Sequence, residues 1–284
     1  MKRTAIQKIL YVLFIVSIGL SLIVPIKAAE DAESNKVLYQ RFLSYLDLKY
    51  INEKIPFLLK TEWDQAGIYA KYTPAKIRVG CWSTAAAQIL YYHRLLPHGK
   101  VSYQCTEGYK IIENLNSYSF NWDLFVNKID DHTPTESIEQ VAKYSYFVAV
   151  VMRKDFGVGG HVGFWHDGFF DSSYFVEMLQ ENYDCNVKAH IFRDNTFLKD
   201  KDEIQKIIKN EIEASRPVIF HFGAGTNGHA VVIDGFSEQK GLFLVHINQG
   251  LGGMGNGVYN LFRPMAKNGV DMERRDILTI KPSK

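Results

Sequence analysis

The chain has 284 residues, of which 46% are hydrophobic, 23% charged and 13% aromatic, and it contains three cysteines. These values exclude a disordered, collagen-like or coiled-coil protein and a small disulfide-rich scaffold. The formal net charge is +2, and it becomes −2 once the four basic residues of positions 1–29, a stretch with no acidic residue, are left out. A nearly neutral body lacks the clustered basic surface of nucleic-acid-binding proteins, so we expect no nucleic-acid partner.

The first 29 residues have the pattern of a secretory signal peptide. The stretch begins with basic residues, continues with the almost wholly apolar residues 9–26, and ends with the small residues Ala28 and Ala29. A membrane anchor is the alternative, since about 18 apolar residues nearly span a bilayer. We expect residues 1–29 to be removed on export, which leaves a secreted (extracellular or periplasmic) protein with no membrane segment.

After the predicted signal peptide, the sequence first shows the patterns of helices. Ser34 can cap a helix within a short N-terminal segment, residues 30–56. The alanine-rich stretch from Cys81 to His93 predicts a second helix. The capping-box spacing at Ser137 predicts the start of another. Two more are predicted over residues 175–182 and 200–215.

The last quarter of the chain has the pattern of β-strands. Their β-branched and aromatic runs cover residues 218–222, 229–233, 242–247, 258–262 and 277–280. Eleven of the 21 glycines fall between Gly223 and Gly269, as expected for tight turns. The order indicates an α+β fold in one domain over residues 57–284, with a helical half to about residue 215 and an antiparallel β half over about 216–284.

Cys81 is the first candidate for chemistry because it stands where the alanine-rich helix begins. Unpaired N–H groups and the positive end of the helix dipole favour the thiolate, which is the nucleophilic form. A buried structural cysteine is the alternative. In an oxidising compartment Cys105 and Cys185 could form a disulfide, which would leave Cys81 as the odd thiol, but the sequence leaves this pairing open.

Three further residues could complete a nucleophilic site. His229, at the start of a predicted strand, is the candidate base. Asn248 ends the next strand, and a hairpin would bring its amide oxygen near the imidazole. The side-chain amide of Gln65 could join the Cys81 backbone N–H in holding an oxyanion. Each residue taken alone also has an ordinary structural explanation, as a surface histidine, a turn asparagine or a surface glutamine.

Together these segments resemble the streptopain family of secreted cysteine peptidases. The matching stretches are WDQ at 63–65, GCWSTAAAQILYYH at 80–93, PHG at 97–99 and GHAVVIDG at 228–235. The resemblance covers most of the chain after the signal and implies a papain-like fold. It also implies Cys81 as nucleophile, His229 as general base and acid, Gln65 in the oxyanion hole and Asn248 as the residue that orients the histidine.

The chain departs from this family at two points. After Asn248 the family has tryptophan twice, whereas this chain has Gln249 and Leu251. An indole there would shield the histidine's hydrogen bond from water, so its loss bears on activity or on substrate preference. In addition, few residues separate the predicted signal from the matching region, so we expect no long inhibitory prosegment.

A glycine-rich stretch at residues 157–167 predicts a loop along the substrate cleft. His161 and Trp165 are its candidates for contact with substrate, together with Gly228 and Gln249 at the strand ends. The histidine spacing in this stretch matches no strong zinc signature, and the glycine pattern at 250–255 precedes a strand, where a dinucleotide site would need a helix. We therefore expect neither a metal nor a cofactor.

The sequence thus predicts a secreted cysteine endopeptidase that acts on protein or peptide substrates through an acyl-enzyme. Two alternatives use the same residues or the same fold. One is an acyl-transfer enzyme of transglutaminase or ligase type, and the other is a catalytically impaired binding or adhesion module.

Overall fold

The computed structural model describes residues 51, 53–157, 172–193, 199–223, 228–263 and 274–283. The predicted signal, the helix expected at Ser34 and the loop residues His161 and Trp165 lie outside these ranges.

The helices agree closely with the periodic segments of the sequence. The α-helices are α2 (Cys81–Tyr92), α3 (Thr135–Val151), α4 (Tyr174–Asn182) and α6 (Lys201–Glu213). The short 3-10 helices are η1 (Gly67–Ala70), η2 (Pro74–Lys76), η3 (Leu115–Ser117) and η4 (Trp122–Leu124). The capping prediction for Ser137 is wrong, because α3 begins two residues earlier, after Pro134. Proline suits this position because the first helical turn has no use for its missing N–H.

An antiparallel sheet in the order β3-β8-β4-β5-β6-β7 forms the second half of the fold. Its strands are β3 (Cys185–Arg193), β4 (Val218–Phe222), β5 (His229–Gln239), β6 (Leu242–Asn248), β7 (Gly257–Asn260) and β8 (Arg274–Pro282). A separate hairpin pairs β1 (Lys100–Gln104) with β2 (Lys110–Asn114). The predicted α+β class is confirmed, and so is the predicted β5–β6 hairpin.

The sequence prediction did not include β1, β2 and β3. Each hairpin strand buries a single residue, Val101 in β1 and Ile111 in β2, so the apolar alternation is too weak to detect. In β3 the alternating Cys185, Val187 and Ala189 was a readable signal.

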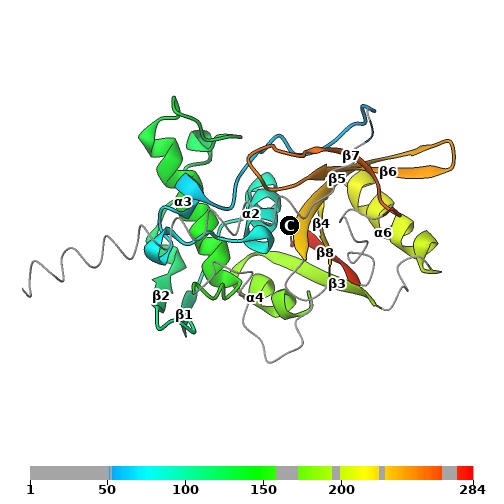
Figure 1. Ribbon diagram of the computed structural model, residues 1–284. Coiled ribbons are helices and arrows are strands. Elements are labelled where there is room, and N and C mark those ends of the chain that lie inside the picture. Colours follow the sequence, from blue (N-terminus) through cyan, green and yellow to red (C-terminus); the bar gives the residue numbers. More distant parts are fainter. Residues whose placement is uncertain are drawn as a thin grey trace, which may run out of the picture.

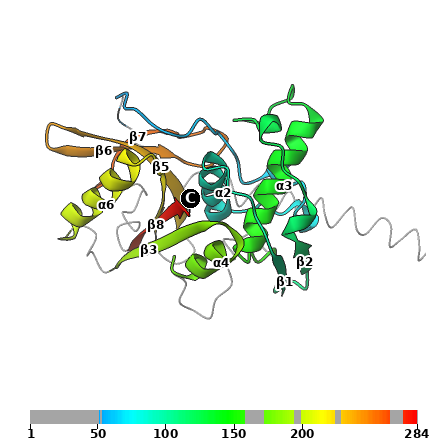
Figure 2. The same cartoon turned by 180° about the vertical axis from the view of Figure 1, so that it is seen from behind.

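The two faces of the sheet are covered by different helices. In Figures 1 and 2, α2 lies between α3 and the sheet, and α6 covers the opposite face. Strand alternation explains this: Ile219 and Val232 pack in the core shared with α2 and α3, whereas Phe220 and Val231 pack with Ile204 of α6. Central strands buried on both faces read as nearly continuous apolar runs, and β4 does so except at His221.

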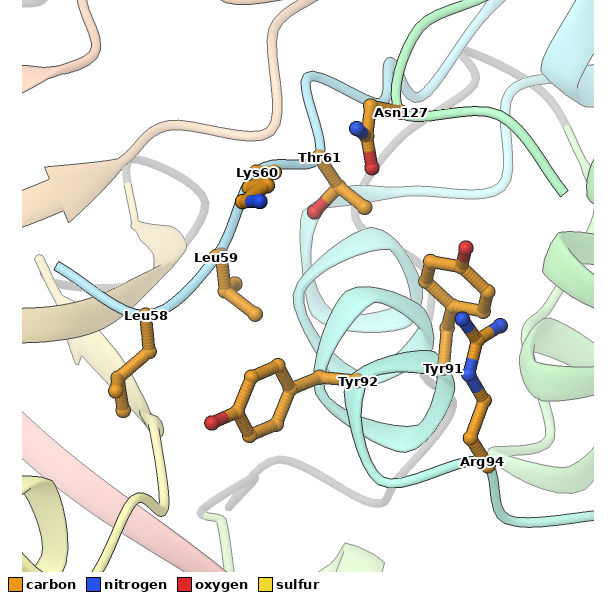
Figure 3. A pocket seen from close by; sticks show the side chains of 8 residues that line it. All are labelled: Leu58, Leu59, Lys60, Thr61, Tyr91, Tyr92, Arg94 and Asn127. Atoms are coloured by element: carbon orange, nitrogen blue, oxygen red, sulfur yellow. The ribbon is translucent and has the colours of Figure 1, made fainter.

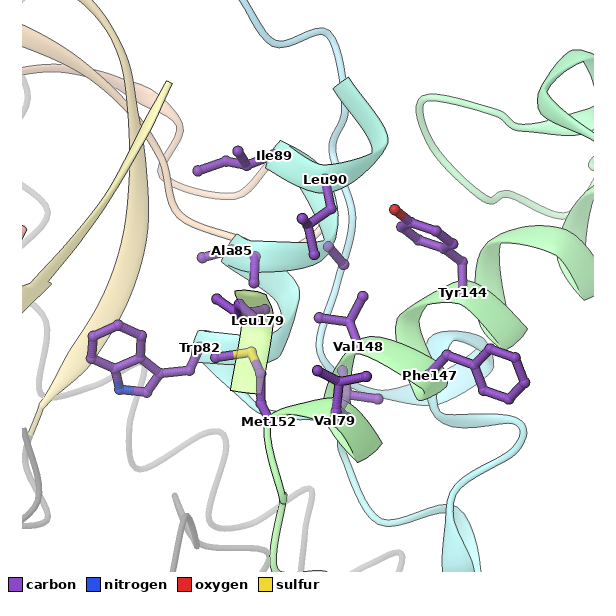
Figure 4. Packing of buried hydrophobic residues seen from close by; sticks show 14 of the residues in the cluster. Val79, Trp82, Ala85, Ile89, Leu90, Tyr144, Phe147, Val148, Met152 and Leu179 are labelled. Carbon is purple, nitrogen blue, oxygen red and sulfur yellow. The ribbon is translucent and has the colours of Figure 1, made fainter. Parts of the chain in front are cut away.

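The helix α2 is the centre of the larger core. Eleven of its twelve residues are buried, which is typical of a helix surrounded by other elements. Figure 4 shows its side chains pointing both ways, with Trp82 and Ile89 on the side of the sheet and Leu90 toward Tyr144 and Val148 of α3. The residue that begins this helix is therefore held rigidly where the helical layer meets the sheet.

Two other sequence expectations can be compared with the structure. Cys81, Cys105 and Cys185 are free, buried thiols, so the possible disulfide between Cys105 and Cys185 is not formed. Cys105 instead accepts a hydrogen bond from the backbone N–H of Phe156. Among the described residues, no helix is both long and apolar enough to cross a membrane.

Candidate functional site

The Cys81 thiol lies at the N-terminus of α2, directly after a glycine with positive φ. Gly80 has φ 90°, a conformation that few residues other than glycine adopt, and this turn leads the chain into the helix. Burial raises the pKa of the Cys81 thiol. Hydrogen bonds from the backbone N–H groups of Ala230 and Trp82 act in the opposite direction. Ala230 lies at the start of β5, 149 residues after Cys81, so the thiol lies beside a segment that is distant in the sequence.

His229 is the residue before Ala230 and is fully buried. Its Nε2 lies 3.0 Å from the carbonyl oxygen of Gln249. A carbonyl oxygen only accepts, so Nε2 donates, and in the neutral ring the lone pair is on Nδ1. Burial lowers the pKa of His229 to about 3, the bond to Gln249 opposes this, and the charge of Arg78 adds to the lowering. The imidazole is therefore neutral in this closed site.

Gln65 lies beside the start of α2 as predicted from its spacing. Its carbonyl oxygen accepts a 2.8 Å hydrogen bond from the N–H of Val79, two residues before Cys81. The side chain is buried, and its amide nitrogen Nε2 has no hydrogen-bond partner in the described part of the chain. A buried donor without a partner costs free energy, which is typical of a site that a ligand oxygen completes.

Asn248 has partners other than the histidine contact predicted for it. Its Nδ2 donates to the carbonyl oxygen of Thr61 at 2.5 Å and to Oε1 of Gln88 at 3.1 Å. Its Oδ1 accepts from Nε2 of Gln88 at 3.3 Å and from the N–H of Gly250 at 3.0 Å. The oxygen placed at His229 Nε2 is thus the backbone carbonyl of the next residue, Gln249.

The two remaining described candidates flank this contact. A Cβ atom on Gly228 would lie 2.4 Å from Nε2 of His221, so glycine permits the close approach of that ring. Gln249 is buried, and its side chain acts together with its carbonyl in opposing the lowering of the His229 pKa. His161 and Trp165 cannot be placed, because they lie outside the described ranges.

Two buried cationic residues that the sequence analysis did not identify act on the Cys81 thiol. Arg78 and Lys154 are buried, and the charge of each lowers the pKa of Cys81. Burial lowers the pKa of Lys154 to about 7, and Arg78 adds to the lowering. The sequence offered a weak signal for Arg78, three residues before the cysteine. It offered none for Lys154, since a lysine in a polar turn normally lies in solvent.

The described surface has hollows at some distance from the thiol. Figure 3 shows one of about 280 Å³ at the C-terminal end of α2, where Tyr92 and Arg94 lie opposite Leu58 and Lys60. Another, of about 480 Å³, lies between Phe57, His246 and Val258. Neither hollow is lined by Cys81 or His229, so the chemistry is assigned from side-chain geometry.

Comparison with known sequences assigns this arrangement to a family. The profile described as Peptidase C10 family matches residues 63–259. Streptopain from Streptococcus pyogenes is 28% identical over 194 residues, which is 64% of this chain and 45% of that protein. Thiol protease/hemagglutinin PrtT from Porphyromonas gingivalis is 27% identical over 214 residues, 71% of this chain and 23% of that protein. The chain thus matches less than half the length of these curated relatives.

Solved structures show the same fold. A fragment of Prevotella intermedia prointerpain A superposes with a TM-score of 0.63 at 20% identity and covers 89% of this chain and 82% of its own. Active interpain A from the same organism, a cysteine protease, gives a TM-score of 0.62 at 19% identity, with 83% and 96% covered. The predicted papain-like fold is thereby confirmed.

Proposed function

The chain belongs to the Peptidase C10 family, and we propose that it is a cysteine endopeptidase that hydrolyses peptide bonds in protein substrates. The observation that carries this proposal is the meeting of two distant segments: Cys81 and Ala230, the residue after His229, lie in one buried cluster, and the backbone N–H of Ala230 favours the thiolate. A nucleophilic sulfur and a neutral imidazole on adjacent segments are the parts that such a reaction needs.

The proposed reaction follows from the atoms present. The sulfur of Cys81 attacks the substrate carbonyl carbon, and the thiol proton passes to Nδ1 of His229. The oxyanion forms between the backbone N–H of Cys81 and Nε2 of Gln65, the buried donor without a partner. His229 then gives its proton to the leaving amine. It next takes a proton from a water molecule, which attacks the thioester and restores the free thiol.

The resting site supports proton transfer during the attack rather than before it. Burial raises the pKa of the Cys81 thiol and lowers that of the His229 imidazole, so both groups are neutral while the site is closed. The positive charges of Arg78 and Lys154 favour the thiolate as it develops. Forming an ion pair in a buried site costs free energy. The bond that forms to the substrate in the same step offsets this cost.

We further propose that the protein is exported and that residues 1–29 are its signal peptide. The basic start, the apolar stretch and the pair of small residues support this assignment. The mass of the mature protein recovered from the culture medium or periplasm would test it: a chain retained at its full 32.5 kDa in the membrane fraction contradicts it.

The central experiment compares peptidase activity of the wild type, Cys81→Ala and His229→Ala on casein in the presence of reductant. We expect both substitutions to lower kcat/KM by about four orders of magnitude or more, because nucleophile and base act as a unit. Cys185→Ala is the matched control: this thiol is also buried, and burial raises its pKa to about 12, so its loss should leave turnover unchanged.

The same experiment separates the alternatives raised by the sequence. A wild type that cleaves casein no faster than Cys81→Ala contradicts the proposal and favours a binding or adhesion module. An acyl-transfer enzyme would instead give amide products that increase with added amine while hydrolysis decreases. Rapid alkylation of Cys81 by iodoacetamide without any turnover would indicate a reactive thiol that serves another reaction.

A further inference from the structure

A pair of buried side-chain amides lies beneath the candidate site. Gln88, on the second turn after Cys81 in α2, is fully buried, and Asn248 at the end of β6 is 2% exposed. Nε2 of Gln88 donates to Oδ1 of Asn248 at 3.3 Å, and Nδ2 of Asn248 donates to Oε1 of Gln88 at 3.1 Å. The two amides therefore form a reciprocal, doubly hydrogen-bonded pair between the helix and the sheet.

The hydrogen-bonding capacity of Asn248 is fully used in this arrangement. An amide offers two N–H donors and two lone pairs on oxygen. The donors go to Gln88 and to the Thr61 carbonyl, and the lone pairs to Gln88 and to the Gly250 amide. No lone pair is left for an imidazole, which explains why the oxygen at His229 Nε2 is the carbonyl of Gln249.

The pair connects the segments that carry the proposed catalytic groups. Oε1 of Gln88 also accepts from the N–H of Trp63 at 3.4 Å, and Asn248 binds the Thr61 carbonyl, so both amides hold the stretch that leads to Gln65. Asn248 also fixes the turn that begins at Gly250 (φ 65°), directly after Gln249. The positions of the Gln65 side chain and of the Gln249 carbonyl, which accepts from His229, thus depend on the same pair of amides.

We propose that Gln88 is a positioning residue for catalysis, which acts through Asn248 to set the Gln65 side chain and the Gln249 carbonyl relative to Cys81. This inference rests on the proposed peptidase function and assigns Asn248 to the same network instead of to direct contact with His229. Misplacement of catalytic groups by about 1 Å costs on the order of 100-fold in rate, so a buried pair remote from the substrate can control turnover.

The test uses Gln88→Met, which keeps the side chain's length and removes the two hydrogen bonds with Asn248 and the one from Trp63. We expect kcat to fall about 100-fold with little change in KM, because substrate contacts remain and only the reacting groups move. Asn248→Leu should lower kcat at least as much, since it also removes the bonds to Thr61 and Gly250. The double variant should lose little more than Asn248→Leu alone, because the bonds between Gln88 and Asn248 are already broken. Gln140→Met is the matched control, because Gln140 also joins its helix, α3, to another segment through two hydrogen bonds, with Asn121 and Tyr118, but lies outside the network.

Two further measurements distinguish the proposed positioning role of Gln88 from a purely structural one. Rates are referred to the folded fraction of each variant, measured by circular dichroism. In Gln88→Glu the carboxylate repels Oδ1 of Asn248, whereas the protonated acid can donate to it. The kcat of this variant per folded molecule, relative to wild type, should therefore rise as the pH falls. Referring the rate to the folded fraction removes the parallel gain in stability that protonation of a buried carboxylate brings.

The pH dependence of Cys81 alkylation by iodoacetamide provides a readout that needs no peptidase activity. We expect Gln88→Met and Asn248→Leu to change this profile in the same way, because both displace the acceptor of His229. A Gln88→Met variant with wild-type kcat and a wild-type alkylation profile overturns the inference while the peptidase function stands. If the wild type does not cleave peptides, the proposed function fails, and the alkylation profiles alone decide the inference.

Discussion

Arg78 places a buried positive charge beside both groups of the candidate site. Its charge lowers the pKa of Cys81, because it favours the thiolate, and lowers the pKa of His229, because it opposes the imidazolium. The charge of Arg78 thus lowers both pKa values. One residue can therefore set the pH at which the thiol becomes reactive without touching the substrate.

Replacing Arg78 by methionine should move the reactivity of Cys81 to higher pH. Without the charge, the pKa of the thiol and that of the imidazole both rise, so thiolate forms only in more alkaline solution. The rate of alkylation by iodoacetamide between pH 4 and 10 measures this, with pH values chosen in steps of about 0.5. Arg94→Met, at the other end of α2, is the control and should keep the wild-type profile. A profile that stays in place or moves to lower pH would contradict the assigned role.

At this scale the sequence predicted which segments meet at the candidate site more easily than the contacts within it. Cys81, Gln65 and His229 were predicted from motifs, and the fold brings their segments together. The partner of the histidine could not be predicted. Whether a side-chain amide or the next carbonyl reaches the ring depends on how the chain turns at Gly250 and on the presence of Gln88 beneath it.

Among the elements, the extended stretch of residues 53–65, here called the strap, has the closest relation to the site. It crosses the sheet before it reaches Gln65. Asp234 of β5 holds it: its carbonyl accepts from the N–H of Leu58, and its Oδ2 accepts from the N–H of Leu59, both at 2.9 Å. The other carboxylate oxygen lies 2.6 Å from Nδ1 of His246. Burial raises the pKa of Asp234, and the bond to His246 opposes the rise.

Removing this carboxylate should loosen the strap. In Asp234→Ala the buried N–H of Leu59 loses its acceptor, which costs about 1–3 kcal/mol. We expect the free energy of unfolding, measured in urea, to fall by about that amount. Asp234→Asn keeps an oxygen for Leu59 and should lose less. Equal stability of the alanine variant and the wild type would show that the strap is held by its apolar contacts alone.

The elements themselves were predictable where their pattern was strong. The nearly continuous apolar run of β4 and the single apolar stripe of α6 both gave correct elements, with boundaries within two residues. Weakly buried strands such as β1 and β2 were not detected, because one inward residue per strand does not make a pattern. The strap also could not be predicted, since its hydrogen bonds go to β5, more than 170 residues away.

Over the whole molecule, the site depends on the contact between the helical layer and the sheet. The proposed nucleophile comes from α2 and the proposed base from β5, and α2 packs directly against both α3 and the sheet (Figures 1 and 4). Small side chains permit this: Ala85, Ala86 and Ala87 are each at most 2% exposed. The alanine run predicted a helix from propensity, but it did not show that larger residues would be excluded on every side.

A larger side chain in this run should therefore affect stability and activity together. Ala86→Leu inserts three carbon atoms where the residue is fully buried, and overpacking of this kind costs about 1–3 kcal/mol. For a domain of this size the melting temperature should fall by about 2–4 °C for each kcal/mol. Calorimetry measures the first effect, and casein hydrolysis well below the transition measures the second. Ala214→Leu, the same substitution at the exposed end of α6, is the control. If Ala86→Leu has the melting temperature of the wild type, the helix and sheet are packed less tightly than the burial of this run indicates. If the variant is destabilised but fully active, the proposed site tolerates movement of the helix that carries Cys81.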